Sequence, residues 1–171
     1  GPLRKKKWNA VSEGNIRASS FGLNDGWVPL YNIHKIFAGL RDAYLLTGTK
    51  DAKQMFINLT AWMYDLTKGL SDDQLQRMLD SEHGGLNETF ADATAISGDE
   101  RFMQLAKRFS HKKVLDPLLR GEDRLTGMHA NTQIPKVIGY KRIADIEGND
   151  QWDKAAQFFW KTVVDNRSIT I

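Results

Sequence analysis

Cysteine is absent from the 171 residues, and this absence excludes several kinds of chemistry. Without cysteine the chain can form no disulfide, and it offers neither a thiol nucleophile nor a thiolate ligand for a metal ion. Cysteine usage therefore gives no information on the redox compartment. Catalysis through a cysteine, and zinc-thiolate sites, are excluded within these residues.

Long apolar runs and a large excess of one charge are also missing. No apolar segment approaches the ~20 residues that a helix needs to cross a membrane. The 24 basic and 21 acidic residues give a net charge of +3, and apart from a short basic run at residues 4–7 the charges are interspersed. We interpret that run as solvated surface. We therefore expect neither a membrane nor a nucleic acid as a partner.

What is present is the composition of an ordinary globular protein. Hydrophobic residues make up 41% of the chain and charged residues 26%, and the length suffices for one domain with its own core. Residues 1–26 are polar and carry glycine-containing turn signals, so we expect them to be a lead-in segment. The domain itself is then expected over residues 27–171.

A repeat of 50 residues organises this domain. Gly48, Gly98 and Gly148 are 50 residues apart each time, and glycine suits the left-handed conformation at the end of a helix. Apolar residues recur four, seven, eight and eleven positions beyond each glycine, which is the spacing of one helical face. An apolar residue also stands eight positions before each glycine: Leu40, Phe90 and Tyr140. Each unit is therefore predicted to be a hairpin of two helices.

Stacked helical hairpins predict an all-α fold. Such hairpins either continue as an open solenoid or close into a ring, and three of them do not close a ring. We expect longer connections between the units over residues 67–73 and 114–126. In the first, Ser71 or Asp72 can cap a helix. In the second, Asp116 and Pro117 signal a turn.

The segments that precede the first helix of each hairpin should meet at one end of the stack, and each carries a histidine. These histidines are His34, His83 and His129, whereas His111 lies in the tail of an outer helix. Nearby side chains add flat apolar faces and amide groups, and imidazoles hydrogen-bond sugar hydroxyls. The predicted carbohydrate-binding residues are His34, His83, His129, Trp27, Tyr31, Asn131 and Gln133.

Other roles for these polar residues stay open at this point. The histidines have no close pairing along a helix that would indicate a metal site, so we expect no metal ligands here. Trp27 and Tyr31 can equally pack in the core. Glu82, Glu88 and Asp92 lie around the second histidine and can serve as the carboxyl pair of a glycosidase, as solvated charges or as helix caps.

Four runs of sequence resemble a known family. They are WVPLYNIHKIFAGLRDAYLLTG, EHGGLNETFADATAISGDERFMQLAKRF, DPLLRGEDRLTGMHANTQIPKVIG and FFWKTVVDNRS. From about Trp8 onward, the chain resembles the catalytic (α/α)6 domain of the β-L-arabinofuranosidase-type glycoside hydrolases, family 127 and its neighbour family 146.

The resemblance implies an α/α toroid of six hairpins, of which this chain would form half, followed in the full protein by β-sandwich domains. It also implies removal of terminal β-L-arabinofuranose from plant or glycoprotein glycans with retention. Family members use a zinc-held cysteine nucleophile and a separate glutamate as acid/base, and these lie beyond the segment resembled here. We therefore expect a fragment without catalytic residues or cofactor, with zinc in the full-length domain.

The resemblance also matches the family's substrate-binding histidines to His34, His83 and His129, and assigns sugar contacts to Asn131 and Gln133. Two other functions stay open: another (α/α)6 carbohydrate-active enzyme, or a non-catalytic helical module that binds a glycan or a protein. Half a toroid would expose the apolar faces of its first and last hairpins, so we expect self-association. For localisation we favour a bacterial periplasmic or secreted protein over a cytoplasmic one.

Overall fold

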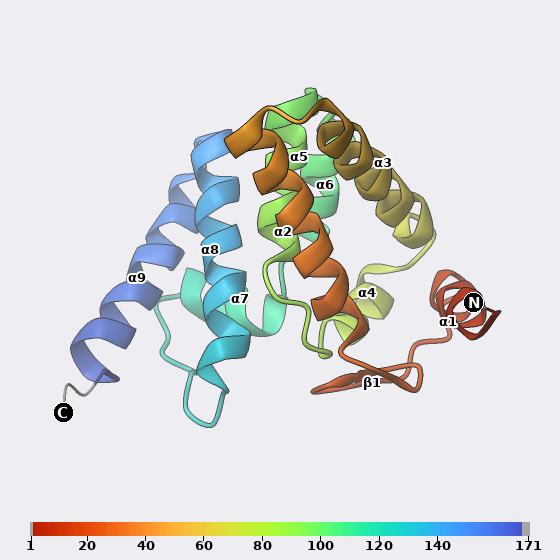
Figure 1. The fold of residues 1–171 in the computed structure, drawn as a ribbon. Helices are drawn as coiled ribbons and strands as arrows, with labels where there is room; N and C mark the ends of the chain where they lie inside the picture. Colours follow the sequence, from red (N-terminus) through yellow and green to blue (C-terminus); the bar gives the residue numbers. More distant parts are fainter. Residues whose placement is uncertain (1, 169–171) are drawn as a thin grey trace.

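The computed structural model describes residues 2–168 and contains three helical hairpins that stand side by side (Figure 1). The predicted all-α hairpin fold is confirmed. The first helices of the hairpins form one row, in which α5 packs against both α2 and α8. None of the described helices is long and apolar enough to cross a membrane. The hairpins are α2 (Pro29–Thr47) with α3 (Lys50–Thr67), α5 (Leu86–Ser97) with α6 (Glu100–Arg108), and α8 (Ala130–Glu147) with α9 (Asp150–Asn166).

The hairpin turns have the geometry that the repeat predicts. Gly48, Gly98 and Gly148 have φ angles of 70°, 75° and 68°, and each donates its N–H to the carbonyl oxygen four residues earlier. The next helix begins two residues later. Its cap is a side chain in two of the three hairpins, where Asp99 and Asn149 accept hydrogen bonds from backbone N–H groups.

The core lies between the first helices and the second helices of the hairpins, and phenylalanine rings fill its centre. The ring of Phe37 meets those of Phe56 and Phe90 edge to face, with centroids 6.0 and 5.2 Å apart, and Phe90 meets Phe109 at 5.0 Å. These contacts join the first hairpin to the second. One member of the repeated apolar pattern differs, because Met55 is 58% exposed.

Two short helices lie in the connections between hairpins. The first, α4 (Asp72–Met78), begins at Ser71, which forms a capping box with Gln74 and confirms one of the two predicted caps. The second, α7 (Lys112–Leu119), covers residues 114–119 of the connection predicted over residues 114–126, so the turn predicted at Asp116 and Pro117 was wrong. Its buried side chains pack with the third hairpin, and this burial outweighs the breaking effect of Pro117.

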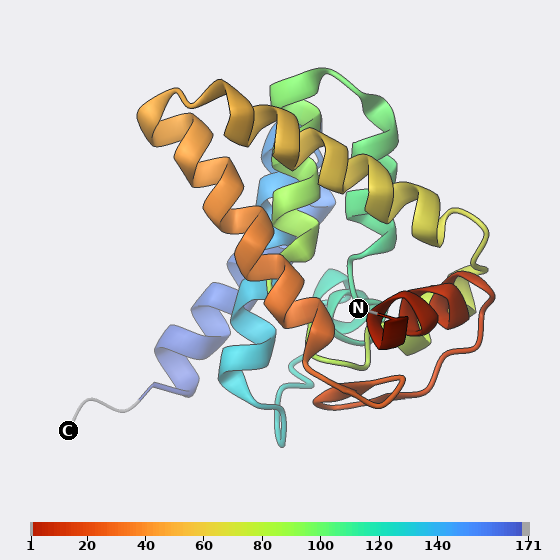
Figure 2. The same cartoon turned by 45° about the vertical axis from the view of Figure 1, so that its right-hand side comes forward.

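The N-terminal segment packs onto the hairpins rather than trailing away from them. Helix α1 (Pro2–Ser12) contacts α3, and Val11 is fully buried. An antiparallel sheet of short strands, β1 (Ala18–Ser19), β2 (Gly22–Leu23) and β3 (Gly26–Trp27), then leads into α2. Figure 2 shows α1 near the end of α3 and the sheet below the start of α2. The sheet therefore lies at the end of the stack where the predicted site residues begin.

Candidate functional site

The segments that enter α2, α5 and α8 lie at the same end of the stack, opposite the glycine turns (Figure 1). We call this end the mouth, and it comprises residues 27–34, 81–88 and 127–136. The arrangement follows from the antiparallel hairpins, because each connection must return to the end from which its hairpin started. The repeat therefore brings the three predicted histidines to one end of the molecule.

His34 lies in the second turn of α2, almost buried at 8% exposure. Its imidazole fits against Gly84, where an added Cβ would overlap the ring, and against Gly85. Burial, together with the charges of Lys35 and Arg41, lowers the pKa of His34 to about 4. The ring is therefore neutral at pH 7, and its Nδ1 has no hydrogen-bond partner within the described residues.

His83 is fully buried beneath the mouth. Its Nδ1 lies 3.0 Å from the carbonyl oxygen of Ser81, and since a carbonyl only accepts, Nδ1 carries the proton. Burial and the charge of Lys136 hold the pKa of His83 well below its usual range, so Nε2 is left as an acceptor. Among residues 2–168, no donor reaches that atom.

Sequence reasoning placed His111 away from the site, but its ring meets that of His83 at 5.8 Å between centroids. His111 is the residue that precedes α7, in the turn between α6 and α7. Its Nδ1 accepts a hydrogen bond of 2.9 Å from Nζ of the buried Lys136. The sequence signal for Lys136 was its position next to Val137 and Tyr140, which indicates that the lysine is buried, whereas no signal marked His111.

A cavity of about 320 Å³ opens beside this pair. Of the predicted residues, the exposed His129 and the partly buried Gln133 line it. The Oε1 of Gln133 is buried and has no partner within the described part of the chain. Asn131 is exposed on the first turn of α8 and does not line the cavity. The mouth thus holds two groups of predicted residues, linked through His83 and His111.

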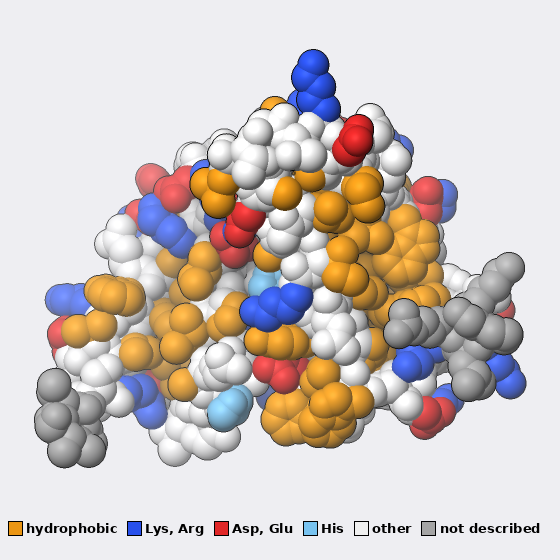
Figure 3. Space-filling view, viewed as in Figure 1, with side chains coloured by type: hydrophobic (Ala, Val, Ile, Leu, Met, Phe, Trp, Pro, Cys, Tyr) orange, Lys and Arg blue, Asp and Glu red, His pale blue; other side chains and the backbone are white. Residues whose placement is uncertain are grey.

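Three aromatic side chains lie at this end of the molecule, of which Phe21 lines the cavity and Trp27 and Tyr31 do not. Trp27 is 74% exposed, which excludes the alternative of core packing for this residue, and its ring packs on Phe21 at 5.6 Å. Tyr31 is partly buried, with its ring centroid 6.3 Å from that of His34. Figure 3 shows apolar side chains gathered at the lower edge of this face, next to a histidine.

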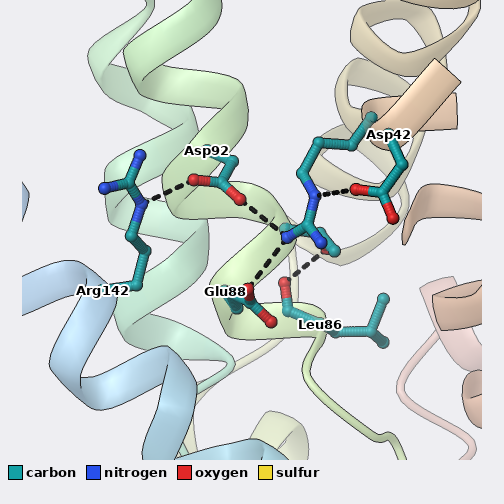
Figure 4. Close-up of polar contacts among 7 residues, drawn as sticks. Asp42, Leu86, Glu88, Asp92 and Arg142 are labelled. Atoms are coloured by element: carbon teal, nitrogen blue, oxygen red, sulfur yellow. Dashed lines mark hydrogen bonds and ion pairs between the residues drawn. The ribbon is translucent and has the colours of Figure 1, made fainter. Parts of the chain in front are cut away.

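The acidic residues of α5 are held by arginine (Figure 4). Nη1 of Arg41 lies 2.9 Å from Glu88 and 2.8 Å from Asp92, and Nε of Arg142 lies 2.6 Å from the other oxygen of Asp92. The ladder ties α2, α5 and α8 together. Since these oxygens are engaged by permanently charged guanidinium groups, the arrangement suits helix positioning better than proton transfer. Glu82 is buried at the mouth, where Thr132 lies 3.4 Å from its Oε1.

The zinc centre implied by the resemblance does not fit the residues of this chain. Cysteine is absent, and the described residues contain no group of three histidine, aspartate or glutamate side chains arranged to hold a metal ion. The imidazoles of His34 and His83 instead offer neutral donors and acceptors, which are groups suited to hydroxyl ligands.

The fold and the mouth define a helical-hairpin domain with a small polar cavity, and comparison with known families gives its class as a glycoside hydrolase. The family described as beta-L-arabinofuranosidase, GH127 catalytic domain, matches residues 5–171. The chain belongs to this family, and the resemblance read from the sequence is confirmed. No curated protein matches the chain.

Proposed function

We propose that this chain is the sugar-binding portion of a retaining glycoside hydrolase that removes terminal β-L-arabinofuranose from plant or glycoprotein glycans. The match to the GH127 catalytic domain over residues 5–171 carries the proposal. The arrangement at the mouth supports it, because neutral imidazoles, an amide and exposed aromatic rings are the groups that carbohydrate sites use.

In this proposal the nucleophile, the acid/base and the zinc ligands lie outside the 171 residues. The absence of cysteine supports this division, since the family's chemistry needs several. The chain's own residues bind and orient the sugar: His34 and its neighbour Tyr31 at the entry of α2, and His129 and Gln133 at the entry of α8. His83 has no exposed surface, so its contribution is to support the rings around it.

The test is hydrolysis of an aryl β-L-arabinofuranoside. The 171-residue chain alone should be inactive, and the same chain joined to a cysteine-bearing second half should release arabinose. His34→Gln in the joined form should lower kcat/KM at least 10-fold, while Asp145→Asn on the exposed part of α8 should leave it unchanged. Absence of activity in every joined form would refute the assignment.

We also propose that the chain associates through the outer faces of its end hairpins. Large apolar residues are exposed on α8 and α9, and others on α2 and α3; they are Ile134, Ile138, Trp160 and Val164, and Ile36, Leu45, Leu46 and Met55. Such surface is costly in water. Sedimentation should show a concentration-dependent increase in mass that Trp160→Glu reduces, and a monomer at all concentrations would contradict it. A bacterial periplasmic or secreted location stays part of the same proposal.

A further inference from the structure

The ammonium group of Lys136 is buried with too few acceptors. The residue is 3% exposed, and among the described residues its Nζ has one hydrogen-bond partner, Nδ1 of His111 at 2.9 Å. An ammonium group carries three N–H donors, so two are left. Because a buried charge without acceptors is costly, this site is incomplete without a further oxygen atom.

The nearby carboxylates are directed elsewhere. Oδ1 of Asp80 lies 3.4 Å from Nε2 of His111 and 3.8 Å from Nζ of Lys113, while Oε1 of Glu82 faces Thr132. Since Lys136 donates to Nδ1 of His111, the proton of that neutral ring is on Nε2, where Asp80 can accept it. Lys136, His111 and Asp80 therefore form a polarised chain whose positive end faces the cavity.

The cavity next to Lys136 has the size and the remaining groups of a small-ligand site. Its volume of about 320 Å³ lies at the lower end of the range for such sites, roughly 300–1,000 Å³. Gln133 lines it, and the buried Oε1 of this residue has no donor among the described residues, while Phe21 gives the cavity an apolar wall. A complementary ligand has an anionic oxygen for Lys136, a hydroxyl for Gln133 and an apolar ring face for Phe21.

We propose that this cavity is a subsite for an acidic sugar residue, a hexuronate, whose carboxylate accepts hydrogen bonds from Lys136 and whose hydroxyl donates to Gln133. The inference deepens the proposed function and rests on it for the carbohydrate character of the ligand. A glycan that presents terminal arabinofuranose close to a uronic acid would then occupy both the histidine side and the lysine side of the mouth.

The test is a calorimetric titration of the chain with D-galacturonate, D-galactose and acetate at pH 7. Galactose carries a hydroxymethyl group in place of the carboxylate of galacturonate, and acetate lacks the sugar. We expect galacturonate to bind at least 10-fold more tightly than either. Lys136→Met should abolish this preference, whereas Lys154→Met, which removes the same charge from an exposed position on α9, should retain it.

A pH series on the unmodified chain tests the inference even if Lys136→Met fails to fold. Burial lowers the pKa of Lys136 to about 8, so galacturonate affinity should fall several-fold between pH 7 and pH 9 while galactose affinity stays constant. His111, with a pKa lowered to about 3 by burial, does not titrate in this range. The other side chains of titratable type at the cavity are those of Asp80, Lys113 and His129, with Glu82 close by.

Three results would overturn the inference. They are equal affinity for galacturonate and galactose, equal affinity for galacturonate and acetate, and an unchanged preference for galacturonate in folded Lys136→Met. These outcomes are distinct from failure of the proposed function. Binding of a β-L-arabinofuranoside without a preference for galacturonate would remove the subsite alone. A preference for galacturonate in a chain that does not bind the arabinofuranoside would refute the proposed activity but not the subsite.

Discussion

Gly84 is the residue that determines where the His34 ring can lie. Its φ of +57° is strained for any other residue, and an added Cβ would overlap the imidazole. Gly84→Ala should therefore lower the free energy of unfolding by about 3 kcal/mol or more, combining backbone strain with overpacking. Urea denaturation measures the change.

Gly121→Ala provides the matched control, because Gly121 has a similar φ of +68° but nothing within 4 Å of its added Cβ. This variant should lose only the strain contribution, about 1–2 kcal/mol. Equal losses in the two variants would mean that the contact between Gly84 and His34 contributes nothing.

The buried neutral His34 makes stability depend on pH. The unfolded chain binds a proton at this ring below pH 6.5, whereas the folded chain binds it only near pH 4. The unfolded state therefore holds more protons in this window, and stability falls as the pH decreases through it. We expect His34 alone to account for about 2 kcal/mol of the loss between pH 7 and pH 5.

Urea titrations of the wild type and of His34→Gln at both pH values measure this contribution. The loss on acidification should be about 2 kcal/mol smaller in His34→Gln. His129→Gln changes an exposed histidine and should keep the wild-type loss. A wild-type loss that His34→Gln leaves unchanged would assign the acid sensitivity to other groups.

Single residues also mark the limit of prediction from sequence. His34, His83 and His129 could be singled out because each lies near the start of the first helix of its hairpin. The contact between His111 and Lys136 could not be predicted, since it joins residues 25 positions apart and depends on a helix that Pro117 concealed. The sequence signal at Lys136 indicates only that this side chain is buried. The burial of His83 could not be predicted from the sequence either, because it results from the packing of several segments around one loop.

At the scale of helices, the approach of α5 to α8 depends on Gly139. The side chain of Asn87 occupies the space where a Cβ would be, and its Nδ2 donates to the carbonyl oxygen of Lys136 at 2.9 Å. Gly139→Ala should therefore destabilise the protein by about 1–3 kcal/mol, since neither helix can move without disturbing the core. Thermal or urea unfolding measures this effect.

Gly39 occupies the equivalent place in α2, nine residues before its hairpin glycine, and has open space around it. Gly39→Ala should stabilise the protein by about 0.5–1 kcal/mol, because alanine favours a helix. Glycine-to-alanine substitution at these two equivalent positions is thus expected to lower stability in α8 and to raise it in α2. Stabilisation by both would show that α5 and α8 are not in close contact.

The hairpins themselves were predictable because independent signals in the sequence indicate the same helix boundaries. Glycine spacing and apolar periodicity indicate the same helix ends around Gly48, Gly98 and Gly148. α7 and the sheet over residues 18–27 were not predictable in this way. Both are short elements whose stability comes from packing on the hairpins rather than from local sequence.

For the whole molecule, the stack of hairpins explains why binding groups from distant segments converge. The mouth gathers residues separated by about a hundred positions, and the ladder from Arg41 through Asp92 to Arg142 fixes the helices that carry them. A rigid set of first helices is what a sugar site needs, since misplacement of its donors weakens orientation. Binding groups gathered at one end of a set of helices are consistent with membership of a glycoside hydrolase family.

The most direct test of the account is an NMR titration of the 171-residue chain with methyl β-L-arabinofuranoside, with the α anomer as control. We predict saturable shifts in the imidazole signals of His34 and His129 with the β anomer, and at least 10-fold weaker binding of the α anomer. No shift in either histidine, or equal binding of the two anomers, would contradict the claim that the mouth is the sugar-binding site.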